Sequence, residues 1–300
     1  MVNHPFDIPE SKKIRLIINT DAKNEADDQF AIVHALLTPR FDIRGIIAAH
    51  FGERRTKTSM QESYDEIVKL LDLMKLTGKV NVLKGAEKAM PNEQTPAMSE
   101  GAELIIREAL ADDPKPLYVI FLGPITDLAA AYLQEPSIAD KLTAVWIGGG
   151  AWPNGEEEFN LSNDIDAANV VFRSPIPLWV IPRSVYSTIR VSIAELAVKV
   201  KPYGDIGAYL YQQLVDFNDR MGGFARWPKG EMWSLGDSPA VSVLLDEHEY
   251  GYEMKPAPRV TKDMLYVHDQ NERLVRWYHF IDPRFTLEDM YAKLQLHYGK

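Results

Sequence analysis

The chain has 300 residues, of which 46% are hydrophobic and 25% charged, and its formal net charge is -10. This composition can fill a sizeable core and argues against disorder, while the negative charge argues against binding to nucleic-acid phosphates. Cysteine is absent, which excludes disulfides and thiolate metal sites. The first residues form no apolar signal core, and no apolar run reaches the ~20 residues of a membrane span. We therefore expect a cytoplasmic protein whose partner is a small molecule rather than nucleic acid or a membrane.

Apolar strand-like segments and amphipathic helix-like segments alternate from residue 14 to about residue 185. The helix-like segments repeat their apolar residues every three or four positions. Several strand-like segments are continuous apolar runs, as in strands that are covered on both faces. This alternation predicts an α/β fold with an open, mostly parallel, doubly wound sheet. The predicted strands lie at 14–20, 41–50, 80–85, 116–123, 142–150 and 177–183.

The last third of the chain is predicted to be helical first and then to carry a short β-rich part. It contains no internal repeat and no low-complexity linker, so we expect a single domain over residues 1–300. The helices are predicted at 193–201, 204–221, 237–247 and 286–298, and the β-rich segments at 264–269 and 273–281.

The stretch INTDAKNEADDQFAI, which follows the first predicted strand, crowds four acidic side chains together: Asp21, Glu25, Asp27 and Asp28. Ligands of open α/β sheets collect at the carboxyl ends of strands, and like charges held close are costly unless a cation or proton offsets them. Carboxylates in a loop suit Ca²⁺ or Mg²⁺ better than zinc. Asp27 and Asp28 could equally serve only to start the following helix, so a metal site and a helix cap both stay open.

Two later stretches also place polar residues where an apolar run turns into a helix. In GGGAWPNGEEEFNLSNDIDAANVVF, residues 148–172, three glycines allow the backbone to approach a ligand closely, and a second polar cluster follows them. In LGDSPAVSVLL, residues 235–245, Asp237 stands directly before Ser-Pro. Asp164 and Asp237 are also ordinary helix-start residues, so these clusters fit either simple caps or one shared site.

Four segments, in this order, resemble the signature of the inosine-uridine nucleoside hydrolase family. NTDAKNEADD is similar to the family's Asp-Thr-Asp-Pro-Gly-x-Asp-Asp with two extra residues, and FLGPITDLAAAY is similar to its LGPLTNLALA segment. IGGGAW with EEEFNLSNDIDAANVVF resembles its Gly-rich and Glu-Phe-Asn pattern, and LGDSPAVSVLL resembles its His-Asp-Pro-Leu-Ala-Val segment. The resemblance extends from about residue 14 to about residue 245.

This resemblance implies an enzyme that hydrolyses the N-glycosidic bond of a purine nucleoside or a related N-riboside, with one Ca²⁺ at the strand ends. In that expectation Asp21 binds the ion and acts as general base toward a metal-bound water. The other implied ligands of the ion are Asp28, Asp237 and the backbone carbonyl of Pro153. The family also implies a homodimer or homotetramer.

The same resemblance implies a set of contacts to the sugar. Asp27 would hold the ribose hydroxyls, and Glu158 and Asn160 would bind the 5′ side of the ribose. An oxocarbenium-like sugar develops positive charge as the C–N bond breaks, and carboxylates near the ring stabilise that charge.

The sequence also departs from the family signature. Asn19 replaces its first Asp, and Gly236 replaces the His that is thought to protonate the departing base. HFGERR lacks an expected Asn, and its His50 is either an acid or a structural residue.

Stacking of the base on aromatic side chains could replace the missing acid. Trp152 and Trp233, together with Trp227, lie near the candidate segments, although large aromatics also serve in cores. Two other functions remain open. One is a catalytically weakened ribose- or nucleoside-binding protein of the same fold. The other is a metal-dependent phosphohydrolase, for which the sequence offers no recognisable Lys and Ser/Thr set.

Overall fold

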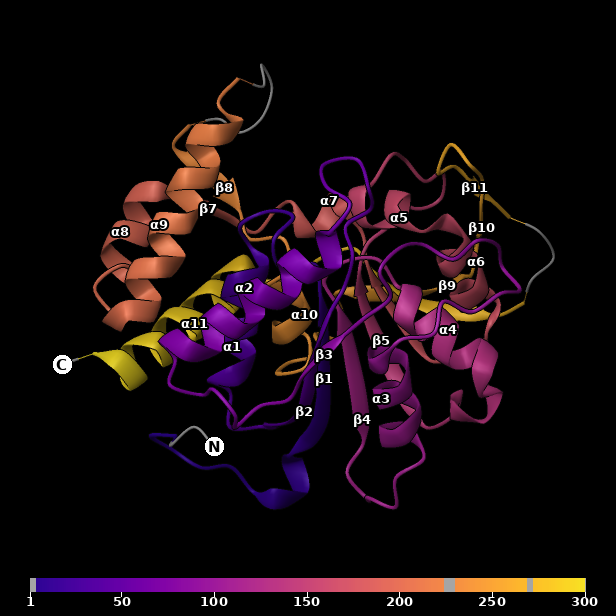
Figure 1. The fold of residues 1–300 in the computed structure, drawn as a ribbon, viewed down its shortest axis with the longest axis horizontal. Helices are drawn as coiled ribbons and strands as arrows, with labels where there is room; N and C mark the ends of the chain where they lie inside the picture. Colours follow the sequence, from indigo (N-terminus) through magenta and orange to yellow (C-terminus); the bar gives the residue numbers. More distant parts are fainter. Residues whose placement is uncertain (1–3, 224–229, 269–271, 300) are drawn as a thin grey trace.

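The structure is a computed structural model that describes residues 4–223, 230–268 and 272–299 (Figure 1). Its centre is an eight-stranded sheet with the strand order β3-β2-β1-β4-β5-β6-β12-β9. Neighbouring strands are parallel from β3 through β12, and β9 pairs antiparallel with β12 at one edge. This confirms the predicted mostly parallel sheet. Its strands are β1 Ile14–Thr20, β2 Phe41–Ala48, β3 Val82–Lys84, β4 Leu117–Phe121, β5 Leu142–Ile147, β6 Leu178–Ile181, β9 Tyr252–Pro256 and β12 Leu274–Tyr278.

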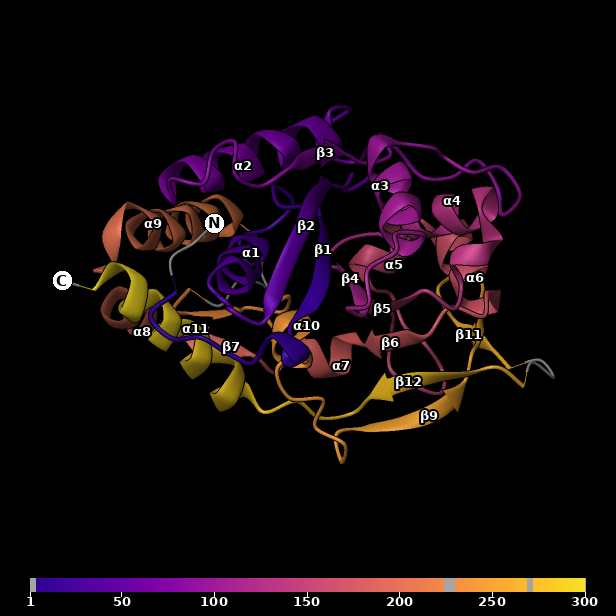
Figure 2. The same ribbon diagram turned by 90° about the horizontal axis from the view of Figure 1, so that it is seen from below.

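Helices cover both faces of the sheet, and each face has its own core. Successive side chains of a strand point to opposite faces, so Leu16 and Ile18 of β1 pack into one core and Ile17 into the other. The view from below shows α1, α2, α9 and α11 on one side of the sheet and α3, α4 and α6 on the other (Figure 2). These helices are α1 Asp28–Leu36, α2 Ser59–Leu73, α3 Glu100–Ala109, α4 Thr126–Gln134, α6 Ile165–Arg173, α9 Gly204–Met221 and α11 Pro283–Tyr298.

The remaining elements are short. They are the 3-10 turns η1 Glu10–Lys12 and η2 Pro136–Ile138, the helices α5 Phe159–Asn163, α7 Arg183–Tyr186, α8 Ile193–Lys199 and α10 Pro239–Ser242, and the strand pairs β7 Arg190–Ser192 with β8 Met232–Ser234 and β10 Arg259–Val260 with β11 Tyr266–Val267. The helix predicted at 237–247 is therefore wrong in length, since only four of its residues are helical. After Ser242 the chain tightens into turns, with Leu244 N donating to the Val241 carbonyl at 3.1 Å, and the helix ends there.

The described ends of the chain lie together, because the His4 ring packs edge-on against His297 with 5.5 Å between centroids. Within the described residues, no helix combines the length and the apolar character that a membrane crossing needs. The carboxyl ends of the parallel strands all face the same way, and the polar segments singled out in the sequence follow β1, β5 and β8. The fold therefore brings segments more than 200 residues apart to one edge of the sheet.

Candidate active site

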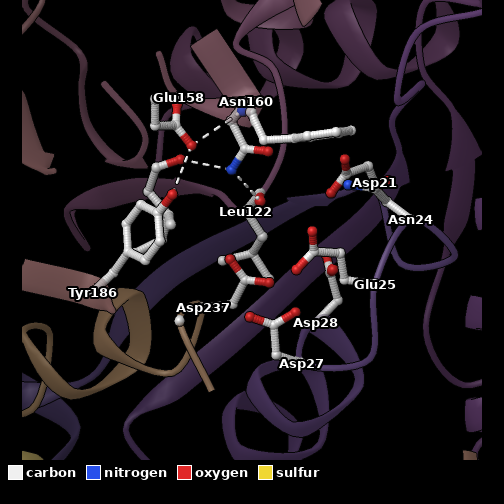
Figure 3. A pocket seen from close by; sticks show the side chains of 13 residues that line it. Asp21, Asn24, Glu25, Asp27, Asp28, Leu122, Glu158, Asn160, Tyr186 and Asp237 are labelled. Carbon is white, nitrogen blue, oxygen red and sulfur yellow. Dashed lines mark hydrogen bonds between the residues drawn. The ribbon is translucent and has the colours of Figure 1, made fainter. Parts of the chain in front are cut away.

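A pocket lies at the carboxyl end of the sheet, and the loops after β1, β4, β5, β6 and β8 line it (Figure 3). Aspartates of the first and last polar segments lie on one side of this pocket, and Glu158, Asn160 and Tyr186 lie across from them. The described lining residues are Asp21, Asn24, Glu25, Asp27, Asp28, Leu122, Ile147, Glu158, Phe159, Asn160, Tyr186, Gly236 and Asp237.

Three buried carboxylates converge in the pocket. One oxygen each from Asp27, Asp28 and Asp237 lies within 4.8 Å of the others. The Asp28 and Asp237 carboxyl groups share a hydrogen bond, and Thr20 Oγ1 donates to Asp28 Oδ1. Two carboxyl groups form such a bond only when a proton offsets their repulsion, so this is a place where a cation could take over the role of the proton.

Asp21 lies beside this group at the end of β1 and is 1% exposed. Its Oδ2 has no hydrogen-bond partner within the described part of the chain. Burial, followed by the charges of Asp28, Glu25 and Asp27, raises the pKa of Asp21 well above its usual range. The side chain packs directly on Gly123, where an added Cβ would come within 2.8 Å of Asp21 Cγ. An unpartnered, closely held carboxylate oxygen is suited to accept a proton or bind an ion.

Helix capping does not explain the first acidic cluster. Asp27 occupies the N-cap position of α1 but makes no side-chain capping hydrogen bond. Burial and the charge of Asp28 raise the pKa of the Asp27 carboxyl group to about 7, and the backbone N–H groups of Gly236 and Asp237 oppose that rise, so the first polar segment lies close to the last. By contrast, Asp164 is a true cap: it accepts from Ala167 N at 2.9 Å and lies outside the pocket lining.

The aspartates of the pocket have no ion-pair partner in the part of the chain that the structure describes. Among the described residues, no Lys or Arg forms an ion pair with Asp21, Asp27, Asp28 or Asp237. Burial is the largest cause that raises the pKa of Asp237, and the charges of Asp27 and Asp28 follow. This crowding carries a free-energy cost that a divalent cation would remove.

Glu158 is held by four protein donors. Its Oε1 accepts from Tyr186 Oη at 2.9 Å and from Asn160 N at 3.1 Å. Its Oε2 accepts from Gly149 N at 2.9 Å and from Leu161 N at 2.8 Å. Glu158 therefore caps α5 and fixes the Gly-rich loop, and its oxygens are already engaged before any substrate arrives.

Asn160 joins the ends of two strands. Its Nδ2 donates to the Leu122 carbonyl after β4 at 2.8 Å and to the Ile147 carbonyl of β5 at 2.9 Å. Both amide protons are therefore used, and Oδ1 is the group that Asn160 can offer to a ligand.

Pro153, Trp152 and Trp233 do not line the pocket. The Pro153 carbonyl lies against His268 Nε2 at 2.6 Å, and the Trp152 ring packs on His268 with 4.3 Å between centroids. Trp233 is 1% exposed and packs edge-on against Phe217 in the core. Trp227 lies outside the described residues. Two residues of the lining, Leu122 and Ile147, have main-chain carbonyls that accept from Asn160 Nδ2, and the role of Pro153 as a ligand stays a prediction.

Several lining residues were not singled out for a role from the sequence. Glu25 belongs to the first acidic stretch, and Asn24 beside it is fixed by Arg55, whose Nη1 donates to the Asn24 carbonyl and to its Oδ1 at 2.6 and 2.9 Å. Tyr186 follows β6 at the carboxyl edge of the sheet, and that position was the available signal. Leu122 contributes only backbone, so its side chain gives no signal.

The replacement of the family's first Asp by Asn19 has a counterpart in the second motif. Asn19 Nδ2 donates to Asp127 Oδ2 at 2.7 Å, and Asp127 stands where the family segment has Asn. Asp127 Oδ1 accepts from Ala86 N at 2.9 Å and from Ser99 Oγ at 2.6 Å. The acid and the amide have thus exchanged places between strand β1 and helix α4, and the number of charges beneath the pocket is unchanged.

His50 has a structural place. It is 1% exposed, its Nδ1 accepts from Gly52 N at 3.2 Å, and its Nε2 lies 2.9 Å from Thr126 Oγ1. Burial lowers the pKa of His50 to about 4, so the ring is neutral at pH 7. His50 is also outside the pocket lining, which leaves it no direct contact with a leaving group.

Comparison with known proteins agrees with these observations. A sequence model of the inosine-uridine preferring nucleoside hydrolase family matches residues 16–285. The chain is 25% identical over 238 residues to the pyrimidine-specific ribonucleoside hydrolase RihA of Salmonella arizonae, covering 71% of this chain and 72% of that protein.

Solved structures of nucleoside hydrolases have the same fold. A plant nucleoside hydrolase, PpNRh1, superposes with a TM-score of 0.74 at 18% identity, covering 94% of this chain and 98% of that one. A purine-preferring ribonucleoside hydrolase from Gardnerella vaginalis gives a TM-score of 0.72 at 23% identity, covering 94% and 99%.

Proposed function

This chain belongs to the inosine-uridine preferring nucleoside hydrolase family, whose members hydrolyse N-glycosyl bonds of ribonucleosides, and on that premise we propose that it is a calcium-dependent ribohydrolase. It cleaves the bond between C1′ and the aglycone nitrogen and releases ribose and the free base. The observation that carries this proposal is the convergence of the Asp27, Asp28 and Asp237 oxygens within 4.8 Å beside the unpartnered Asp21 oxygen.

The donor set fits a hard cation. It consists of carboxylate oxygens and one backbone carbonyl, and the described lining contains no His. In our proposal Asp21, Asp28, Asp237 and the Leu122 carbonyl hold Ca²⁺. When bound, the ion lowers the pKa of a water molecule and neutralises part of the charge in the pocket.

The chain's own groups supply the remaining chemistry. Asp21 accepts the proton of the attacking water, because its Oδ2 is free and its neighbours raise its affinity for a proton. Asp27, which lies close to Gly236 of the last polar segment, binds ribose hydroxyls, and Asn160 Oδ1 binds the 5′ side. Glu158 positions Asn160 and Tyr186 rather than contacting the sugar itself.

Asp21→Asn tests the proposal. We expect turnover of a nucleoside panel and of p-nitrophenyl riboside to fall about 1,000-fold, with an unchanged circular dichroism spectrum. Asp166→Asn, in another of the family segments and outside the pocket, is the matched control and should retain activity. Unchanged rates in Asp21→Asn would remove Asp21 from the mechanism.

A ribose- or nucleoside-binding protein without catalysis is the second candidate, and Gly236 is the observation that favours it. Calorimetry with ribose and inosine, with and without Ca²⁺, separates the two functions: binding without turnover of any riboside would establish the second. We also propose that the chain assembles as a homodimer or homotetramer, which light scattering measures.

A further inference from the structure

The described lining of the pocket is rich in carboxylates and poor in acids that could protonate a leaving group. Among the described lining residues there are six carboxylates and no Lys, Arg or His. The six are Asp21, Glu25, Asp27, Asp28, Glu158 and Asp237. Even with a bound divalent cation, these groups leave the pocket negative when they are ionised.

Position 236 cannot supply the missing acid in this fold. A Cβ on Gly236 would come 2.9 Å from Tyr186 Cδ2 and 3.3 Å from Asp27 Oδ2. The Tyr186 ring thus fills the space that a side chain at position 236 would need. Gly236 and Tyr186 therefore form a matched pair, which we call the Tyr186–Gly236 wall.

Tyr186 is itself a poor proton donor to a leaving group. Its hydroxyl donates to Glu158 Oε1 at 2.9 Å. Loss of that proton would leave a phenolate against a carboxylate, which is strongly unfavourable in a buried site.

The charge of the aglycone decides whether such an acid is needed. When the bond from C1′ to nitrogen breaks, the electron pair stays on nitrogen. A neutral heterocycle then leaves as an anion unless it is protonated, and a carboxylate-lined pocket destabilises that anion. A cationic heterocycle leaves as a neutral molecule and needs no proton.

We propose that this pocket selects N-ribosides whose aglycone is a cationic aromatic heterocycle, that is, ribosylpyridinium compounds, over neutral purine and pyrimidine nucleosides. The inference rests on the proposed ribohydrolase function. The water oxygen bonds to C1′, its proton passes to Asp21, and the electron pair of the broken bond cancels the ring's positive charge, so no co-reactant is needed. Glu25, which lies in the two-residue insertion, places a further carboxylate in the lining and adds to the attraction for the positive ring.

The test compares kcat/KM for three compounds with the full chain in Ca²⁺: N-ribosylnicotinamide, inosine and p-nitrophenyl β-D-riboside. The nitrophenolate leaves without protonation, so the third compound reports ribohydrolase activity alone. We expect kcat/KM for the ribosylpyridinium to exceed that for inosine by about 100-fold or more. If inosine is hydrolysed as fast as the ribosylpyridinium and the nitrophenyl riboside is also cleaved, the inference is overturned and the proposed function stays intact. Hydrolysis of none of the three would overturn both.

Two variants sharpen the test. Burial, followed by the charge of Asp27, raises the pKa of Glu25 to about 8. In assays above that pH, Glu25→Gln should lower the ratio of kcat/KM for ribosylnicotinamide over nitrophenyl riboside about 5-fold, because it removes an ionised carboxyl group from the lining. Glu157→Gln, at an exposed glutamate outside the pocket, is its matched control and should leave the ratio unchanged. The double variant Tyr186→Thr with Gly236→His should raise inosine turnover relative to Tyr186→Thr alone. An unchanged ratio in Glu25→Gln would contradict the electrostatic argument even if the double variant fails to fold.

Discussion

Among the residues that the structure describes, buried charge forms ion pairs at the amino ends of the parallel strands, whereas the aspartates at the carboxyl ends form none. Arg15 of β1 is 3% exposed, and its guanidinium donates to the Lys115 carbonyl at 2.9 Å and faces the Glu108 carboxylate at 3.7 Å. Arg44 Nε binds the same carboxylate at 2.9 Å. Six residues after Arg15 and just past the end of β1, Asp21 begins a pocket whose four aspartates form no ion pair with any described Lys or Arg.

The difference separates two uses of buried charge. A paired network belongs to the fold and is complete without a ligand. A cluster of like charges costs stability until a cation binds, and that cost is what makes a binding site. Stability measured with and without Ca²⁺ can therefore tell the two ends of the sheet apart.

The largest effect is expected at the carboxyl end, from Asp28→Asn or Asp237→Asn. Activity should fall about 1,000-fold and the stabilisation by Ca²⁺ should vanish, because a ligand of the ion is lost. Without metal, the free energy of unfolding of these variants should be about 1 kcal/mol higher than that of the parent. The pKa of each carboxyl group is raised in the folded state, so the parent loses stability as pH rises toward neutrality, and the amide variants do not. Thermal denaturation at pH 7.5 with chelator and with Ca²⁺ measures both. A variant that is less stable than the parent in the absence of metal would contradict the idea that the clustered carboxylates cost stability.

At the amino end, Glu108→Gln should act in the opposite sense. It leaves Arg15 buried with a weakened partner and should lower the free energy of unfolding by about 3 kcal/mol. The difference in the free energy of unfolding between this variant and the parent should be the same with and without Ca²⁺. Glu103→Gln, exposed on the same helix α3, is the control and should change the free energy little. Urea denaturation of the three proteins at one Ca²⁺ concentration gives the result.

The Asn19–Asp127 pair combines one buried charge with one amide, and the effects on stability of substituting its two residues are expected not to add. Asn19→Asp alone places two carboxylates against each other and should destabilise the fold by about 2 kcal/mol. Adding Asp127→Asn lets the new amide donate to the new acid, and we expect stability to return to within about 0.5 kcal/mol of the parent. A double variant as unstable as the single one would show that the exchange is not symmetrical.

The smallest effect is a pH dependence set by His50. Its pKa in the folded state is about 4, below its ordinary value of 6.5, so the unfolded chain binds the proton more readily. Its contribution to stability is complete above pH 6.5 and is lost as pH falls toward 4. We expect the free energy of unfolding to drop by about 1 kcal/mol between pH 7 and pH 5.5, and His50→Gln to flatten that slope. An equal slope in the variant would assign the titration to another group.

The strand pattern of the sequence was enough to predict the sheet, because short apolar runs such as that of β1 are typical of strands covered by helices on both faces. Asp21–Asp28 could be placed at the carboxyl edge of the sheet because they follow the first predicted strand. Asp237 could be grouped with them only through the family resemblance, since it follows β8, which belongs to the separate antiparallel β7–β8 pair. Leu122 could not be found this way, since a backbone carbonyl leaves no mark on the side-chain sequence. The fit between Tyr186 and Gly236, 50 positions apart, depends on side-chain packing, which the periodicity of the sequence does not reveal. The burial of Trp233 in the core, away from the pocket, also depends on such packing and could not be predicted.

The contact between His4 and His297 means that the described backbone nearly closes into a ring. The existing ends could therefore be joined by a short linker without disturbing the fold. New ends could be opened at an exposed turn such as Asp140–Lys141, on the amino side of β5. A circular permutant of this kind would keep every carboxylate of the pocket in place. Its retention of ligand binding would show that the geometry of the site belongs to the sheet and not to the order in which the chain is read.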